Sequence, residues 1–460
     1  MTERIATGCI GLDEILGGGI PANTISVIMG APGTGKTILA EGIAFCNATA
    51  ERPALYLTTL SEPLEKFIFH GQNYDFFDPA KVGVSVIYED LGRMVRDAGI
   101  EKLPDVVSDL IIKYKPALLF IDSFKSLNEL LQLPMERRTV MYDLATVLTS
   151  YRCTSFLIGE YSEAMTTNLP EFAIADVVLK LTRFSTNVRE QRFLGVEKLR
   201  GSGSIPGLHA FAITNKGIEI FPRLLSPTVA PTYEPKVERV NTGIGGLDDM
   251  IEKGFWRGST TLMVGPSGAG KTVLALHFIR EGARRGERCL YVGFQENPSQ
   301  MARVMHNLGW NATELLENGN FELMYRSPVE MQLDSVAAEI FERVRTGKVQ
   351  RIVIDALGDL ERCSIDQQRF ADFIYALTQW FAAENVTCVM TSELSGLFEV
   401  SKITDEQVSN MSDNLVLLGF TSGQEMHRTI RIIKTRGSNH DNRQHFLEIS
   451  DKGARIRKAE

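Results

Sequence analysis

The sequence predicts an α/β protein built from two tandem copies of one module, each a mostly parallel sheet flanked by helices. Two observations predict this fold class. First, motifs recur in the same order at a spacing of 235 residues, as from 7 to 242 and from 36 to 271. Second, short unbroken apolar runs alternate with helical patterns in each copy. Such runs are typical of parallel strands that are covered on both faces.

The first copy shows the expected elements in order. An apolar run ends in a glycine-rich turn and leads into a helical pattern, and further apolar runs follow. Strands that alternate with helices in this way favour a parallel sheet. The expected elements are a strand at 25–29, a helix at 38–48, a strand at 55–57, an amphipathic stretch at 105–114, and strands at 117–121 and 154–158.

A proline-rich segment separates the two copies. Residues 222–235 contain Pro222, Pro227, Pro231 and Pro235, and four prolines in 14 residues prevent a regular helix and favour an extended linker. The expected divisions are an N-terminal domain over residues 1–222, a linker over 223–236 and a C-terminal domain over 237–460.

Composition excludes several classes of protein. The chain has 460 residues, 44% of them hydrophobic and 23% charged, which fits an ordinary globular protein of two to four domains. Disorder throughout, a collagen-like repeat and a disulfide scaffold are excluded. The net charge of −8 argues against a dedicated duplex-DNA binder, because phosphate neutralisation needs clustered Lys and Arg.

The cysteines and the N-terminus indicate the compartment. None of the six cysteines lies in a CxxC pair, so no zinc site is suggested and the thiols fit a reducing cytosol. The N-terminus has no basic region followed by an apolar one, and no stretch reaches about 18 apolar residues. We therefore expect a cytoplasmic protein that is neither exported nor inserted in a membrane.

Two glycine-rich loops carry phosphate-binding chemistry. Residues 30–37 (GAPGTGKT) and 265–272 (GPSGAGKT) both match GxxxxGK[ST], each between an apolar strand and a helix. The glycines let backbone N–H groups point inward at a phosphate, the lysine reaches the β and γ phosphates, and the threonine ligates Mg²⁺. A purely structural turn does not explain two such matches. The expected nucleotide-binding residues are Gly30, Gly33, Thr34, Gly35, Lys36 and Thr37, and Gly265, Ser267, Gly268, Ala269, Gly270, Lys271 and Thr272.

Each copy also has an acid at the end of an apolar strand. Asp122 ends ALLFID and Asp355 ends RIVID. Such an aspartate can cap a helix, but downstream of a phosphate loop it is expected to orient water on the Mg²⁺. The expected metal residues are therefore Thr37, Asp122, Thr272 and Asp355.

Hydrolysis further requires a group that positions or deprotonates the attacking water. The candidates follow the second strand of each copy, Glu62 in TLSEP and Gln295 with Glu296 in FQENP. The alternative for either glutamate is a helix N-cap or a first-turn carboxylate that the helix dipole favours. The two sites are not chemically identical, since Ser61 stands opposite Glu296.

Taken together, these motifs resemble the KaiC family of circadian-clock ATPases and autokinases, and the chain looks like a non-cyanobacterial KaiC-like member. The resemblance implies two tandem RecA-like P-loop NTPase domains that bind ATP and Mg²⁺ and form a double-ring hexamer. It also implies a KaiB-like regulatory partner. Besides the loops, it rests on the TGxxGLD openings at 7–13 and 242–248, the KLRG and KTRG strands at 198–201 and 434–437, and residues 211–222, 403–418 and 449–453.

In this family ATP lies between adjacent subunits, and cations of one subunit reach the phosphates held by its neighbour. The residues that match these trans contacts are Lys198 and Arg200 in the first copy, and Lys434, Arg436, Arg428 and His440 in the second. The alternative for each K-x-R pair is a solvated strand edge. Ser204 stands where the family usually has a histidine, so a weaker contact is expected in the first copy.

The sequence departs from the family at two further places. The glutamate pair that follows the second strand is Gln295-Glu296 here, with Glu62 displaced in the first copy, so base catalysis uses shifted positions or is slower. The family's two adjacent phosphoacceptors correspond to Ser409 and Asn410, so at most single-site autophosphorylation at Ser409 is expected. The alternative for Ser409 is an ordinary strand hydroxyl.

The leading interpretation is an oligomeric ATPase with serine/threonine autokinase activity in the C-terminal domain. A RecA/RadA-like DNA-dependent ATPase is one rival, but it needs basic and aromatic channel loops, and residues 396–412 offer Lys402 beside Glu399, Asp405 and Glu406. No nucleic-acid partner is therefore expected. A non-catalytic scaffold stabilised by ATP is the other rival, and the complete loops and strand-end acids oppose it. Regulation through the family's C-terminal tail is not expected, because the chain stops at Glu460.

Overall fold

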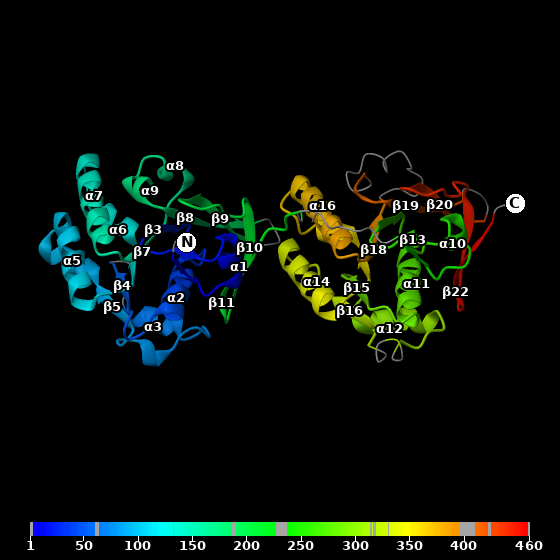
Figure 1. Cartoon of the computed structure of the whole chain (residues 1–460), viewed down its shortest axis with the longest axis horizontal. Helices are drawn as coiled ribbons and strands as arrows, with labels where there is room; N and C mark the ends of the chain where they lie inside the picture. Colours follow the sequence, from blue (N-terminus) through cyan, green and yellow to red (C-terminus); the bar gives the residue numbers. More distant parts are fainter. Residues whose placement is uncertain are drawn as a thin grey trace. The chain divides into compact units, whose positions relative to one another are not determined.

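The computed structural model describes most of the chain as two compact units, Met1–Arg223 and Leu224–Glu460 (Figure 1). Most of the expected linker, residues 227–236, lies outside the described part. No helix in the described part is long and apolar enough to cross a membrane. The described residues are 3–59, 64–131, 133–185, 190–226, 237–312, 315, 319–329, 331–394, 410–421 and 425–458, without the side chains of 64–67.

The first unit contains a nine-stranded sheet in the order β11-β10-β9-β8-β3-β7-β6-β4-β5. The strands from β8 to β5 are parallel, and β9, β10 and β11 extend the sheet with antiparallel pairs. The strands are β3 (Ile25–Gly30), β4 (Ala54–Thr58), β5 (Val86–Asp90), β6 (Leu118–Asp122), β7 (Thr154–Gly159), β8 (Val177–Ser185), β9 (Glu190–Leu199), β10 (Leu208–Thr214) and β11 (Gly217–Phe221), and β1 (Arg4–Ile5) pairs separately with β2 (Ile20–Pro21).

Helices cover this sheet, and both of its faces are buried. Alternate residues of a strand point to opposite faces. Along β6, Phe120 packs in one hydrophobic cluster and Leu119 and Ile121 pack in another. The helices are α1 (Ile10–Ile15), α2 (Lys36–Asn47), α3 (Leu64–Gly71), α4 (Leu91–Ala98), α5 (Leu103–Tyr114), α6 (Phe124–Asn128), α7 (Pro134–Ser150), α8 (Glu163–Thr166) and α9 (Pro170–Ile174), with 3₁₀ turns η1 (Pro79–Lys81) and η2 (Ile100–Lys102).

The second unit repeats this arrangement with the order β16-β15-β17-β18-β14-β19-β20-β21-β22, so the predicted fold class is confirmed. Its strands are β14 (Thr260–Gly265), β15 (Cys289–Gly293), β16 (Phe321–Tyr325), β17 (Arg351–Asp355), β18 (Thr387–Glu393), β19 (Asn414–Phe420), β20 (Arg428–Thr435), β21 (His445–Ser450) and β22 (Gly453–Arg457), and β12 (Arg239–Val240) pairs with β13 (Phe255–Trp256). Its helices are α10 (Leu247–Met250), α11 (Lys271–Arg284), α12 (Pro298–Asn307), α14 (Leu333–Gly347), α15 (Leu357–Glu361) and α16 (Gln367–Ala383).

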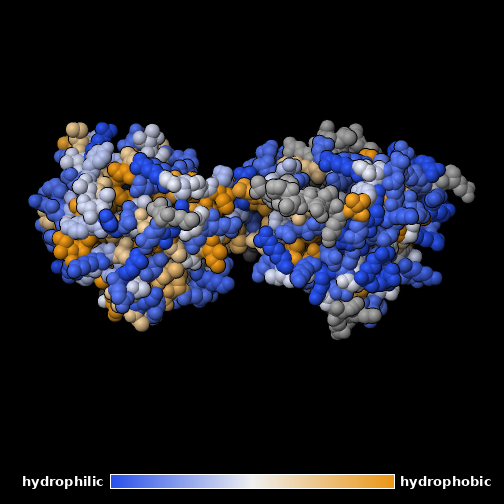
Figure 2. Space-filling view, in the orientation of Figure 1, coloured by the Kyte–Doolittle hydropathy of each residue, from blue (hydrophilic) through white to orange (hydrophobic). Residues whose placement is uncertain are grey.

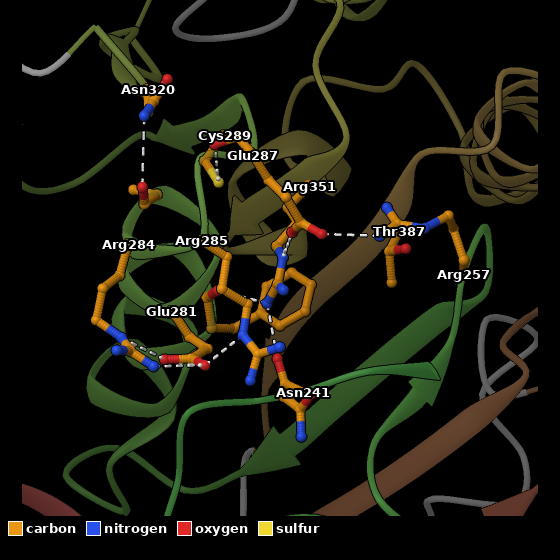
Figure 3. Close-up of polar contacts among 12 residues, drawn as sticks. Asn241, Arg257, Glu281, Arg284, Arg285, Glu287, Cys289, Asn320, Arg351 and Thr387 are labelled. Atoms are coloured by element: carbon orange, nitrogen blue, oxygen red, sulfur yellow. Dashed lines mark hydrogen bonds and ion pairs between the residues drawn. The ribbon is translucent and has the colours of Figure 1, made fainter. Parts of the chain in front are cut away.

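A buried ion network ties the beginning of the second unit to its core (Figure 3). The Arg351 side chain, which is 1% exposed, forms an ion pair with Glu287 and donates to the carbonyl oxygens of Asn241 (2.7 Å) and Phe278 (3.1 Å). Arg257 donates to the other oxygen of Glu287 at 2.7 Å. In the first unit the corresponding strand β6 begins with Leu118 in place of Arg351, so the first unit lacks the arginine at the centre of this network.

Candidate functional site

Each glycine-rich loop joins the central strand of its sheet to a helix. In the first unit the loop runs from β3 to α2, and in the second from β14 to α11. Gly35 and Gly270 precede the helices with φ of 99° and 103°, a conformation that glycine adopts without steric cost. The first N–H groups of a helix have no partner within it, so both helices present free donors toward the loop.

The loop lysines lie folded over their loops. Lys36 donates from Nζ to the Ala31 oxygen at 2.9 Å, and Lys271 donates to the oxygens of Gly265 (2.7 Å) and Pro266 (2.9 Å). Burial lowers the pKa of both ammonium groups. Nearby carboxylates oppose this shift, Glu160 for Lys36 and Glu393 for Lys271.

The threonines and strand-end aspartates form matched pairs. Thr37 donates to Asp122 Oδ2 at 2.7 Å, and Thr272 donates to Asp355 Oδ2 at 2.7 Å. A tyrosine from the neighbouring strand donates to the same carboxylate oxygen, Tyr56 in the first unit and Tyr291 in the second. Hydroxyl and carboxylate oxygens are the ligands that Mg²⁺ prefers, and Mg²⁺ commonly takes one or two carboxylates and completes its shell with water and phosphate. Both pairs therefore fit a Mg²⁺ ion.

A cleft of about 490 Å³ opens at the first loop. A second pocket, of about 240 Å³, adjoins it along α2, and Ile38 lines both. The cleft is lined by Gly33, Gly35, Lys36, Thr37, Ile38, Asp122, Ser123, Lys125, Ser126, Glu129, Glu160 and Ile213. The adjoining pocket is lined by Thr7, Gly8, Cys9, Ile38, Leu39, Gly42, Phe45, Cys46, Phe76, Lys216 and Ile218.

The place of the adjoining pocket is occupied by a side chain in the second unit. Gly42 of α2 corresponds to His277 of α11, 235 residues later. The His277 ring accepts from the Ala454 N–H at 2.8 Å, contacts the Gly243 oxygen at 3.2 Å and packs edge-on against Trp310. The His277 side chain therefore fills, in the second unit, the position that Gly42 leaves open in the first.

Glu296 follows β15 and is half-buried. Burial raises the pKa of its carboxyl, and the negative charges of Asp355 and Asp359 raise it further. The N-cap of α12 is Asn297, whose side chain accepts from the Gln300 N–H at 3.0 Å, so Glu296 is not the cap. Gln295 donates to Asp359 at 3.1 Å. Glu62, the other expected catalytic residue, lies outside the described residues.

The K-x-R pairs lie near the ends of the sheets at which the central strands begin, whereas the loops follow the ends at which those strands finish. Lys198 pairs in register with Val178 near the beginning of β8, whereas the loop follows the end of β3. The Arg200 N–H donates to the oxygen of Asp176, whose carboxylate accepts from the N–H of Ile25, the first residue of β3. At about 3.3 Å per residue, the five steps from Ile25 to Gly30 place Arg200 about 17 Å from its own loop.

The second unit repeats this arrangement for Lys434 and Arg436. The Arg436 N–H donates to the oxygen of Asp413, whose carboxylate accepts from the N–H of Thr260 at the beginning of β14. The side chains of the pair donate to backbone oxygens of the same segment, Lys434 to Ser412 at 2.7 Å and Arg436 to Asn410 at 3.0 Å.

The remaining expected contacts are placed differently. Arg428 begins β20 and donates to the Gly268 oxygen of its own loop at 3.0 Å, so the structure does not bring it together with Lys434 and Arg436. His440 lies in the connection between β20 and β21, and Ser204 in the connection between β9 and β10. Ser409 lies outside the described residues.

Sequence reasoning missed three kinds of residue at these sites. Glu160 and Glu393 lie at the ends of β7 and β18 and face the loop lysines, and Glu160 Oε1 lies 4.0 Å from Lys36 Nζ. An acid at the end of an apolar run was the available signal, as it was for Asp122. The tyrosines of the aspartate pairs recur at the repeat spacing, so the duplication could have identified them. The third is Lys125 in the cleft.

Comparisons with known proteins agree with this geometry. The model of the KaiC ATPase family matches residues 5–224 and again 240–460. The circadian clock oscillator protein KaiC of Picosynechococcus sp. is 28% identical over 467 residues, covering 99% of this chain and 90% of the relative. The circadian clock oscillator protein KaiC 1 and the circadian clock protein KaiC3 of Synechocystis sp. are each 27% identical, covering 99% of this chain and 89% and 92% of those proteins.

Proposed function

Because the chain belongs to the KaiC family of ATPases, with the ATPase domain duplicated, we propose that it hydrolyses ATP at both loops, assembles into a double-ring hexamer and phosphorylates its own Ser409. The observation that carries the ATPase proposal is the repeated pairing of a loop threonine with a strand-end aspartate, at 2.7 Å in both units. A structural turn has no need for this pairing.

In each site the chain's own residues divide the work. The loop N–H groups and Lys36 or Lys271 bind the phosphates, and Thr37 with Asp122, or Thr272 with Asp355, would hold Mg²⁺. When bound, Mg²⁺ neutralises charge that develops on the phosphate oxygens. The pocket along α2 fits the nucleobase, because it begins at Ile38, directly beyond the phosphate cleft.

Glu296 is the proposed base of the second site. A carboxylate with a raised pKa accepts a proton more readily than an ordinary glutamate, and the elevation here follows from burial and from two neighbouring carboxylates. Gln295, the residue before Glu296, donates to Asp359 at 3.1 Å. For the first site we retain Glu62 on the sequence argument alone.

The position of the K-x-R pairs supports assembly. Since Arg200 lies about 17 Å from its own loop, we propose that the phosphate it contacts is held by another copy of the chain. Hydrophobic surface is also more extensive over the first unit than over the second in the view of Figure 2, and its exposed side chains include Leu133, Met135 and Tyr142. Association would cover such surface.

The autokinase proposal rests on the segment that follows Ser409. Asn410 and Ser412 are bound through their backbone oxygens by Arg436 and Lys434, the cations that we propose to reach a neighbour's phosphates. Residues 410–412, which follow Ser409 in the sequence, therefore lie at the end of the sheet at which a neighbour's ATP would lie. From the family resemblance we further propose a KaiB-like partner. The six free cysteines support a cytoplasmic location.

Three measurements test the proposal. Sedimentation should show a species near six chains with Mg-ATP and smaller species without it. ATP turnover should not depend on single-stranded DNA, and stimulation by DNA would favour the recombinase-like alternative. Mass spectrometry after incubation with Mg-ATP should find one main phosphopeptide, which Ser409→Ala removes. A chain that binds ATP without turnover would instead be a scaffold.

A further inference from the structure

Lys125 is a cation of the first cleft that has no counterpart in the second unit. It lies in α6, which begins directly after Asp122 and the following serine, and it lines the same cleft as Lys36 and Thr37. The position three residues after the strand-end aspartate of the second unit is Gly358. A Cβ built on Gly358 meets nothing within 4 Å, so crowding does not explain the glycine there.

Lys125 lies over the end of the strand next to β6. Strand β7 lies between β6 and β3, and α6 lies beside β7 (Figure 1). A Cβ on Gly159, the last residue of β7, would approach the Lys125 Cβ to 3.1 Å. The lysine therefore packs over the end of β7 and projects from the Asp122 side of the cleft.

The partner of Lys125 in this structure is weak. Its ammonium lies 3.2 Å from Glu129, one helical turn further along, and that carboxylate is 62% exposed while the lysine side chain is 24% exposed. A solvent-exposed ion pair of this kind contributes little to stability. A polyphosphate carries several negative charges into the cleft and can replace such a partner.

Resting on the ATPase function proposed above, we propose that Lys125 is a phosphate-binding catalytic residue of the first site, supplied by the same subunit that holds the nucleotide. The loop wraps the inner phosphates, so a cation on the opposite side of the cleft meets the terminal phosphate. The second unit, with Gly358, relies on the loop and on the neighbouring subunit for this charge.

The test uses the full chain in a Lys271→Ala background, so that only the first site binds nucleotide. Mg²⁺ with the non-hydrolysable analogue adenylyl imidodiphosphate, and Mg²⁺ with ADP, are titrated by calorimetry. Lys125→Met should weaken binding of the analogue about 10- to 100-fold, because one charge-assisted hydrogen bond is lost. The affinity for ADP should change less than about threefold. Lys125→Arg should retain most of the affinity.

Glu129→Gln is the matched control, because it breaks the ion pair and keeps the cation. Binding of the analogue should then stay the same or become tighter. The inference is overturned if Lys125→Met binds the analogue as tightly as its parent, if it loses ADP to the same extent, or if Glu129→Gln causes an equal loss. If the Lys271→Ala parent itself binds neither nucleotide, the proposed function of the first site fails instead.

Discussion

Removal of the Arg351 guanidinium tests whether the buried ion network stabilises the second unit (Figure 3). Arg351→Met keeps the aliphatic stem but leaves the oxygens of Asn241 and Phe278 without this donor and Glu287 with one arginine fewer. Breaking a buried ion pair typically costs about 3–5 kcal/mol, and we expect the lower part of that range because Arg257 still pairs with Glu287. With about 1–3 kcal/mol per molar urea, the unfolding midpoint should fall by about 1 M or more.

Tryptophan fluorescence reports this transition selectively, because all three tryptophans, Trp256, Trp310 and Trp380, belong to the second unit. Arg285→Met is the matched control, since it removes an arginine that is 47% exposed and pairs with Glu281 within α11. It should cost no more than about 1 kcal/mol. Glu287→Met combined with Arg351→Met should cost less than the two single changes added together. Strict additivity, or an unchanged midpoint in Arg351→Met, would refute the network's role.

The pH dependence of this unit gives the network a second signature. The pKa of Glu287 is lowered in the folded chain, because its ion pairs with Arg351 and Arg257 outweigh the opposite effect of burial. A carboxyl with a lowered folded pKa contributes stability that is fully present above its unfolded pKa of about 4.3 and is lost as the pH falls through the folded value. In Arg351→Met the stability of the second unit should therefore fall less steeply as the pH is lowered.

Three further predictions concern the sites. Lys36→Ala should mainly reduce assembly and ATP turnover, and Lys271→Ala should mainly abolish phosphorylation; equal losses of all three activities would contradict a division of tasks. Glu296→Gln should slow labelling by about 10²–10⁴-fold while ATP still binds. In the unchanged chain, labelling should decline as the pH falls through a pKa above the ordinary glutamate value, and Glu296→Gln should lose this dependence. Gly42→His should fill the pocket along α2 and weaken nucleotide binding at the first loop, as measured in a Lys271→Ala background; unchanged affinity would exclude the pocket as the nucleobase site.

The sequence predicted the parts of the fold that depend on local pattern. The apolar runs at 25–29, 117–121 and 154–158 became β3, β6 and β7 because parallel strands buried on both faces read as continuous hydrophobic stretches. The strands β9 to β11 were not predicted, because antiparallel strands with mixed burial mingle polar and apolar residues. The helix after the first loop begins at Lys36 rather than 38, because Gly35 already provides its N-cap.

Site residues that lie within one sequence motif could be predicted. Site residues that come together only through the strand order were harder to predict. Lys36 and Thr37 sit within one motif, and their aspartate partner followed from a strand-end rule. Lys125 could not be found this way, because its place in the same cleft as the loop depends on the strand order, in which β7 separates β6 from β3. Lys198 lies near the beginning of β8, away from the loop, because β9 pairs antiparallel with β8. No local sequence pattern shows this pairing.

The two units share the same core of site residues and differ in the residues around it. Both keep the loop, the threonine–aspartate pair and the tyrosine that donates to it. Thr391 also donates to the Asp355 carboxylate, whereas the corresponding residue of the first unit, Ile158, has no polar group to donate. The second site therefore holds the Asp355 carboxylate from a further direction and has Glu296 near it, which suits transfer to a fixed acceptor. The first site instead has Lys125 and an open pocket at Gly42, which suits capture of ATP and its hydrolysis by water. If both sites performed the same reaction at the same rate, these differences between them would serve no purpose. The differences therefore indicate that the two sites have two separate tasks.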